Sequence, residues 1–223
     1  MKIQIYAFTD VDQALRAVDL GVDQIGFIAG DYGEVHAELS FSEARRLRDA
    51  VSSDATAVAL TMATESDEII RMAEFVLPDI VHISTDPDAV DKHEMADLRR
   101  RLPEGTELMK AIHVEGDASL DLAMEFEPVS DYLLLDTKVE GMPGVGATGT
   151  PHDWNISRRI VETVAVPVVL AGGLSPANVA EAIQVVRPWG VDSNTATNVE
   201  GDPVEKDMSK VAAFVQAVRN TEQ

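Results

Sequence analysis

The chain has 223 residues, and 45% of them are hydrophobic, which is enough to fill the core of one α/β domain. Its 39 acidic residues against 18 basic ones give a formal net charge of −21, which argues against nucleic acid and anionic membranes as partners. The absence of cysteine excludes disulfides, thiolate metal sites and a cysteine nucleophile.

Short apolar runs alternate with amphipathic segments along the whole chain, which is the pattern of repeated βαβ units. Most of the apolar runs are nearly continuous, as expected for parallel strands that are buried on both faces. The eight predicted strands cover residues 3–6, 24–28, 56–62, 80–83, 107–112, 132–135, 166–170 and 190–192.

Helix start signals precede four of the amphipathic segments, at Asp10, Ser40, Thr64 and Ser175–Pro176. A final helix near residues 206–218 carries an apolar face and would close the ring. An open doubly wound sheet shows the same alternation, but eight units in this length favour a closed ring. The sequence therefore predicts a single (β/α)8 TIM barrel over residues 1–223.

Two glycines, Gly172 and Gly173, follow the seventh predicted strand and precede a helix start. Paired glycines let backbone N–H groups approach an anion, and barrels commonly bind phosphate in the loops after strands seven and eight. Asp192, Asn194 and Thr195 end the eighth strand and add small polar residues beside them. These residues predict a phosphate site, although the glycines alone would also fit a simple tight turn.

Asp136 directly follows the apolar sixth strand, at the end where barrel enzymes place their active sites. Partial burial there would raise its pKa enough for general acid catalysis. The alternative is a helix cap or an ion pair with Lys110 or Lys138. The glycine-rich stretch 137–152 is much longer than an ordinary βα connection and is predicted to lie over the active end.

His82 and His113 fall at the ends of predicted strands four and five, where their rings could face the site. Each would also be ordinary as a polar strand-end residue. The histidines show no HxH or HExxH spacing, so the sequence offers no support for a zinc site.

Six segments occur in an order that resembles the phosphoribosylanthranilate isomerase family, and the resemblance covers nearly the whole chain. It implies a barrel enzyme that catalyses an Amadori rearrangement of a phosphorylated sugar adduct without a cofactor. It also implies that Asp136 is the general acid that protonates the ring oxygen. The segments are GVDQIGF (21–27), LSFSEAR (39–45), LLLDT (133–137), GTPHDW (149–154), AGGLSPANV (171–179) and VD (191–192).

The chain departs from this family at strand ends that contact substrate. Tyr6 stands where the family has the cysteine that acts as general base, and a neutral phenol is a poor base at pH 7. Ala37 replaces an arginine, and residues 82–85 and 194–196 also differ. The base is therefore left open between Tyr6, His82 and His113, and Lys110 is interpreted as an electrostatic partner of Asp136 or of substrate.

These departures keep two further hypotheses open: a paralogue acting on another sugar phosphate, and a non-catalytic barrel that binds a phosphorylated metabolite. The expected partner is a phosphorylated small molecule, with no nucleic acid and no membrane, and the protein is either a monomer or a homodimer. With neither a signal peptide nor a membrane span in the sequence, a cytoplasmic location is expected. The acidic residues are spread along the chain, which favours adaptation to high salt.

Overall fold

The computed structural model describes residues 1–30, 32–33, 35–51, 53–137 and 152–222, and most of the predicted stretch 137–152 lies outside these residues. Eight parallel strands form a closed barrel, because β1 pairs with β9 on one side and with β2 on the other. The barrel strands are β1 (Lys2–Ile5), β2 (Gln24–Ala29), β4 (Thr56–Thr61), β5 (Ile80–Ile83), β6 (Glu107–His113), β7 (Tyr132–Asp136), β8 (Val168–Leu170) and β9 (Gly190–Ser193). This confirms the predicted TIM barrel.

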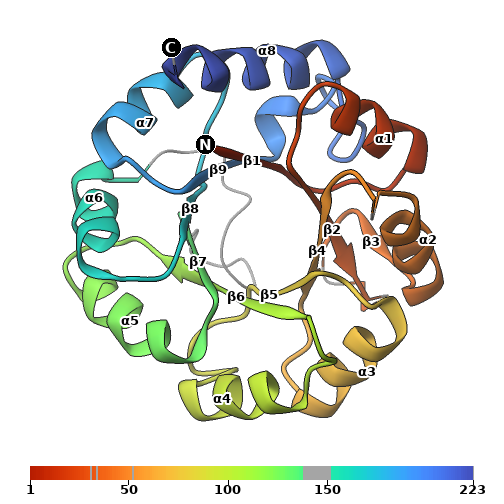
Figure 1. The fold of residues 1–223 in the computed structure, drawn as a ribbon, viewed down its shortest axis with the longest axis vertical. Helices are drawn as coiled ribbons and strands as arrows, with labels where there is room; N and C mark the ends of the chain where they lie inside the picture. The colour runs from red at the N-terminus through yellow and green to blue at the C-terminus, as the bar shows by residue number, and fades with distance from the viewer. Residues whose placement is uncertain (31, 34, 52, 138–151, 223) are drawn as a thin grey trace.

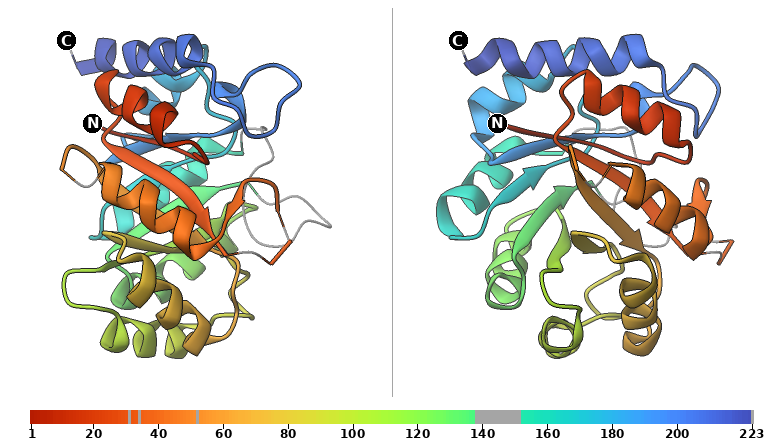
Figure 2. Two further views of the ribbon diagram at one scale, coloured as in Figure 1. Left: turned by 90° about the vertical axis from the view of Figure 1, so that its right-hand side faces the viewer. Right: turned by 45° about the vertical axis from the view of Figure 1, so that its right-hand side comes forward.

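Helices surround the barrel on its outside, as the view down the barrel shows (Figure 1). They are α1 (Val11–Asp19), α2 (Phe41–Val51), α3 (Ser66–Val76), α4 (Lys92–Arg101), α5 (Ala118–Phe126), α6 (Trp154–Thr163), α7 (Val179–Val186) and α8 (Met208–Arg219). Short 3-10 turns are η1 (Glu127–Val129), η2 (Thr195–Thr197) and η3 (Asn220–Glu222). The side views in Figure 2 show the long final helix α8 lying across the β1 and β9 side of the ring. None of the helices in the described residues is long and apolar enough to cross a membrane.

The helix start signals act as expected at two places. The Asp10 side chain accepts the N–H of Gln13 and caps α1, and Ser40 exchanges hydrogen bonds with Glu43 at the start of α2. The other two predicted starts were early. Helix α3 is preceded by Glu65, which makes no capping bond, and α7 begins only at Val179.

Alternate residues of each strand face opposite sides of the barrel wall. The outward residues, such as Ile3, Ile25 and Val191, join the large apolar core under the helices. The inward residues form a second, smaller cluster that includes Tyr6 and Leu134. The side chains that meet at the barrel mouth therefore come from the inward positions near the ends of the strands.

One further short strand lies outside the barrel, and the sequence did not indicate it. Strand β3 (Glu38–Leu39) pairs with the end of β2. Glu38 also accepts the backbone N–H groups of Tyr32, Gly33 and Val35, which holds the loop after β2 in place.

Candidate active site

Asp136 ends β7 at an inward position, beside the mouth of the barrel. Its Oδ1 accepts the backbone N–H of Thr137 at 2.6 Å. Burial raises the pKa of the carboxyl from its ordinary value to about 7, and the Thr137 hydrogen bond opposes this only in part. A carboxyl with such a pKa can both give and take a proton near neutral pH.

Gly172 is the residue that lets the groups around Asp136 come together. A Cβ at this position would lie 2.7 Å from Thr137 Oγ1, 2.8 Å from His152 Nδ1 and 3.2 Å from Asp136 Oδ1. Its φ of 83° also favours glycine. The paired glycine after β8 therefore has a packing role beside Asp136 as well as the predicted role toward an anion.

His152 belongs to this group, and the sequence analysis did not single it out. Its Nδ1 lies 3.1 Å from Thr137 Oγ1 and its Nε2 lies 2.7 Å from Ser157 Oγ. Burial lowers the pKa of His152 to about 4, so the ring is neutral at pH 7. The neighbouring Asp153 caps α6, and this helix start was the available signal that residue 152 lies at the mouth.

The predicted phosphate loop after β8 is tightly held. Asn178 donates through Nδ2 to the carbonyl of Gly173 at 3.0 Å and accepts the N–H of Ser175 at 2.8 Å. Ser193, on the neighbouring β9, donates to the carbonyl of Leu174 at 2.8 Å. These bonds fix a left-handed turn, in which Gly172 and Gly173 both have positive φ, next to the end of β9.

The loop after β9 contains Asn194 and Thr195, and a buried lysine lies behind it. Lys206 Nζ donates to Asn194 Oδ1 at 2.9 Å, to the Asn194 carbonyl at 3.3 Å and to Asn198 Oδ1. Burial lowers the pKa of Lys206 to about 7, while Asp192 opposes this shift. Sequence reasoning missed Lys206 because it lies twelve positions beyond Asn194 and only the loop brings the two together.

Asp192 faces the interior from β9 and is 7% exposed. Its Oδ1 accepts a hydrogen bond from Gln4 Nε2 at 3.1 Å. Burial raises the pKa of Asp192 to about 8; the Gln4 bond and Lys206 lower it, and Asp136 raises it further. The barrel interior thus contains two carboxyls, and the charge of Asp136 raises the pKa of Asp192.

Tyr6 and His82 are brought together by the fold. The Tyr6 hydroxyl lies 2.9 Å from His82 Nδ1, and the Tyr6 ring covers Gly26, where a Cβ would fall 2.5 Å from the ring. Burial raises the pKa of Tyr6 well above its ordinary value, with Asp192 adding to the shift. Burial also lowers the pKa of His82 to about 3, and the positive charge of Lys110 contributes. Both groups are therefore neutral at pH 7.

His113 and Lys110 lie on opposite faces of β6. His113 faces inward and is paired in register with Asp136. The Lys110 side chain lies on the helix side, where Nζ donates to the Thr85 carbonyl at 2.5 Å and stands 5.3 Å from the centre of the Phe126 ring. Burial lowers its pKa to about 7, and Asp86 opposes the shift. Lys110 is therefore not among the residues that the structure brings together with Asp136.

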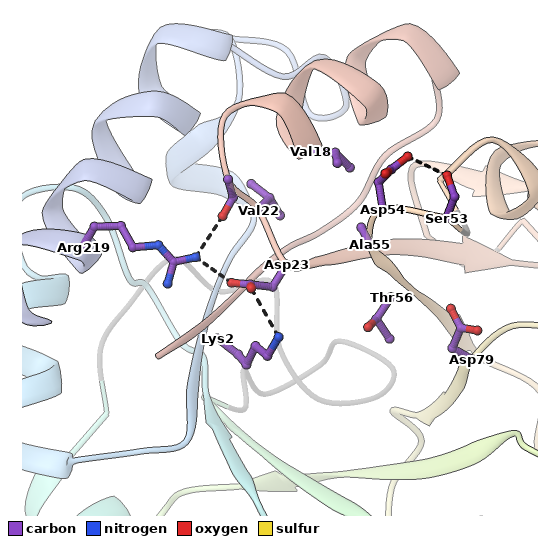
Figure 3. Close-up of a pocket in the computed structure, with 11 residues that line it drawn as sticks. Lys2, Val18, Val22, Asp23, Ser53, Asp54, Ala55, Thr56, Asp79 and Arg219 are labelled. Atoms are coloured by element: carbon purple, nitrogen blue, oxygen red, sulfur yellow. Dashed lines mark hydrogen bonds and ion pairs between the residues drawn. The ribbon is translucent and has the colours of Figure 1, made fainter.

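A separate hollow of about 530 Å³ opens at the opposite end of the barrel, where the strands begin (Figure 3). Its two basic residues share one carboxylate: Arg219 contacts Asp23 at 2.9 Å, and Lys2 contacts it at 3.4 Å. The other two acidic residues of the lining accept hydrogen bonds, Asp54 from the Ser53 hydroxyl and Asp79 from the Ala57 N–H. Barrel enzymes place their chemistry at the other end. In the described parts of the chain, no group of three or more His, Asp or Glu side chains could hold a metal ion.

Comparison with known proteins shows one family. The family described as N-(5'phosphoribosyl)anthranilate (PRA) isomerase matches residues 3–217. Curated relatives named N-(5'-phosphoribosyl)anthranilate isomerase include one from Methanothrix thermoacetophila, 32% identical over 98% of each chain, and one from Halobacterium salinarum, 35% identical over 96% of this chain and 94% of the relative.

Solved structures agree with this match. The phosphoribosyl anthranilate isomerase from Thermotoga maritima superposes with a TM-score of 0.80 at 26% identity, over 99% of each chain. A second structure from that organism has a TM-score of 0.77 at 25% identity over 99% of each chain, and it is described as monomers of a dimeric phosphoribosylanthranilate isomerase.

Proposed function

Because the chain belongs to the N-(5'-phosphoribosyl)anthranilate (PRA) isomerase family, we propose that it isomerises PRA in tryptophan biosynthesis with Asp136 as its general acid. The reaction converts an aldose adduct into a ketose by an internal oxidation and reduction, and it needs no cofactor. The observation that carries the assignment of the acid is the inward carboxyl of Asp136 at the mouth, with a pKa raised to about 7 by burial.

A general acid has to hold a proton at the working pH and then release it to the substrate. An ordinary aspartate is ionised at neutral pH, whereas Asp136 keeps its proton in a large part of the molecules. Protonation of the ring oxygen by Asp136 would let the C1′–O bond of the ribosyl ring break. The Thr137 N–H, which bonds Oδ1, would stabilise the carboxylate that remains.

The phosphate group of PRA would lie at the loops after β8 and β9. The backbone N–H groups of Gly173, Thr195 and Ala196 donate to no other described residue, so they are available to an anion. The Lys206 ammonium behind Asn194 adds positive charge to a chain that is strongly acidic. These features support the phosphate site predicted from Gly172, Gly173, Asn194 and Thr195. Asp192 was predicted with them, but its buried carboxyl bonds to Gln4 in the barrel interior and, when ionised, offers no donor to a phosphate.

Tyr6 and His82 would line the site on the side where the family has its cysteine. Their hydrogen bond at 2.9 Å keeps the phenol and the imidazole in one arrangement. In their neutral forms they would offer hydrogen bonds to the sugar hydroxyls. The pKa of Tyr6 lies above its ordinary value and that of His82 is about 3, so neither group readily accepts a proton at pH 7.

The test is an assay of PRA turnover in high salt by the wild-type protein and by the Asp136→Asn and Tyr6→Cys variants. We expect turnover by the wild type and its loss in Asp136→Asn, because the amide cannot donate a proton to the ring oxygen. An inert wild type combined with an active Tyr6→Cys variant would instead show that the native substrate is different. No turnover by any variant, together with no binding of inorganic phosphate, would refute the function and the phosphate site.

A second candidate function is isomerisation of a different phosphorylated sugar adduct. It is favoured by the Tyr6–His82 contact and by Ala37, which replaces the family's arginine and packs against the interior cluster. A screen of N-glycosides of ribose 5-phosphate would separate the two candidates.

Sedimentation analysis in high salt would decide between a monomer and a homodimer.

A further inference from the structure

The chain lacks a cysteine, and the Tyr6–His82 pair is poorly suited to accept a proton, so another interior group has to accept it. His113 lies on β6, four strands from β1 in the ring, whereas Asp192 lies on β9, which pairs with β1. Asp192 meets the geometric requirements. It faces the barrel interior near the mouth and is not fully enclosed. Only Oδ1 is engaged, by Gln4, and Oδ2 receives no hydrogen bond from any residue of the described ranges.

The charged and titratable groups around Asp192 come from several elements. Gln4, directly opposite on β1, donates to Oδ1 and favours the ionised form. Lys206, before α8, favours the ionised form too, whereas Asp136 on β7 opposes it. Tyr6, after β1, is close enough for Asp192 to raise the pKa of its phenol. Asp192 is thus an inward carboxyl close enough to the position of the missing cysteine to raise the pKa of Tyr6.

We propose that the Asp192 carboxylate is the general base that removes the C2′ proton of the substrate, the role that the family gives to a cysteine. This inference rests on the proposed function. Burial raises the pKa of Asp192 to about 8, so its ionised form is a stronger base than an ordinary aspartate and is more populated as the pH rises towards that value. Because the charge of Asp136 raises the pKa of Asp192, the two carboxyls titrate as a pair, and the active form is the one in which Asp136 holds a proton and Asp192 is ionised.

The proton transfers balance over the whole reaction. Asp136 gives its proton to the ring oxygen, the C1′–O bond breaks, and the nitrogen forms a C1′=N iminium. Asp192 Oδ2 takes the C2′ proton; the C2′–H electron pair becomes the C1′=C2′ bond, and the iminium electrons return to nitrogen. The enol hydroxyl then returns a proton to Asp136, and Asp192 delivers its proton to C1′. C1′ is reduced and C2′ is oxidised, with no outside reactant.

The experiment measures PRA turnover with ordinary substrate and with substrate deuterated at C2′, using wild type, Asp192→Asn and Asp192→Ala. We expect kcat to fall by about 10²- to 10⁴-fold in both variants, as for loss of a general base. Added formate, which can occupy the space of the lost carboxylate, should restore part of the activity of Asp192→Ala. The restored reaction should show a primary isotope effect, because formate then removes the C2′ proton.

The control is Asp121→Asn, which changes an exposed aspartate of α5 and should leave turnover unchanged. Circular dichroism and inorganic phosphate binding would confirm that the Asp192 variants are folded. If wild type is inert toward PRA, the proposed function and this inference both fail. If wild type turns over and Asp192→Asn is equally active, only this inference fails. The same holds if Asp192→Ala is inactive and formate restores nothing, because Asp192 would then serve only to bind substrate.

Discussion

The carboxyl of Asp136 determines how activity should depend on pH. Its pKa of about 7 means that the protonated form is lost as the pH rises past that value. Because the general acid acts in its protonated form and the proposed base Asp192, with a pKa of about 8, acts in its ionised form, kcat/KM for PRA should be highest between about pH 7 and about pH 8 and should fall on both sides. Steady-state kinetics across this range would test it. A constant kcat/KM from about pH 6 to about pH 9 would contradict the role of Asp136.

The same carboxyl should affect stability in a definite direction. Its folded pKa of about 7 lies above the value of about 3.9 expected in the unfolded chain, so the folded protein binds this proton more tightly. The stabilisation that this proton provides is complete at pH values below the pKa of Asp136 in the unfolded chain. It is lost as the pH rises through the pKa of Asp136 in the folded protein. The amide of the Asp136→Asn variant does not ionise, so this variant does not lose stability in that way. Its free energy of unfolding should therefore rise relative to that of wild type as the pH is raised from about 4 to about 8. Urea unfolding at several pH values would measure it, and a constant difference would argue against the shift.

Gly172 allows a test with a matched control. Gly172 and Gly105 have similar φ values, 83° and 87°, but a Cβ would crowd Thr137 and His152 at Gly172 and would meet nothing within 4 Å at Gly105. Alanine at either site bears the backbone strain, and only Gly172→Ala adds the steric clash. We expect Gly172→Ala to lower the free energy of unfolding by about 1–3 kcal/mol more than Gly105→Ala. Equal losses of unfolding free energy in the two variants, measured by urea unfolding, would show that the residues around Gly172 accommodate the added methyl group without a loss of stability.

At the scale of elements, helix α4 depends on a capping box that α3 lacks. Asp91 accepts the N–H groups of His93 and Glu94, and Glu94 accepts the N–H of Asp91 in return. Asp91→Ala should therefore cost about 0.5–2 kcal/mol. Glu65, before α3, makes no capping bond, so Glu65→Ala should change stability by less than about 0.5 kcal/mol. Thermal unfolding would measure the loss of stability in each variant relative to wild type. Equal losses in the two variants would show that the capping box does not stabilise α4.

The sequence predicted the barrel strands well, because buried parallel strands are nearly continuous apolar runs bounded by polar turns. Every predicted barrel strand is present, with ends that agree within two residues. The same continuous apolar runs do not indicate which residues face the barrel interior and which face the helices. In a strand that is apolar on both sides, alternation gives no direction, so Lys110 was expected beside Asp136 and instead faces the helices.

The candidate site was only partly predictable. Asp136, Asp192 and the paired glycines could be named as candidates because they lie at or just after the ends of strands, and the ends of barrel strands converge at one mouth. Lys206 and His152 reach the same region from distant loops, and no local pattern shows this. The contact between Tyr6 and His82 joins residues 76 positions apart, so it depends on barrel closure.

For the whole molecule, the net charge of −21 should make stability depend on salt. Repulsion between carboxylates acts over about 10 Å in 0.1 M salt and over about 3 Å in 1 M salt. We therefore expect the Tm to rise steadily as KCl is increased from about 0.1 M to above 1 M. Replacing KCl by an equal osmolarity of sucrose would control for solvent exclusion. A Tm that stays constant or falls with KCl would refute the proposed adaptation to high salt.

The closure of the ring between β1 and β9 also has a consequence for biosynthesis. Residues 2–5 pair with residues 190–193, so β1, the first barrel strand to be translated, cannot complete its pairing until β9 has been synthesised. At ribosomal speeds of about 5–20 residues per second, this wait lasts roughly ten to forty seconds. During that time one edge of β1 is without its native partner, and such edges invite association between nascent chains. Protein yield should therefore depend on chaperone supply during translation more than on the stability of the finished barrel.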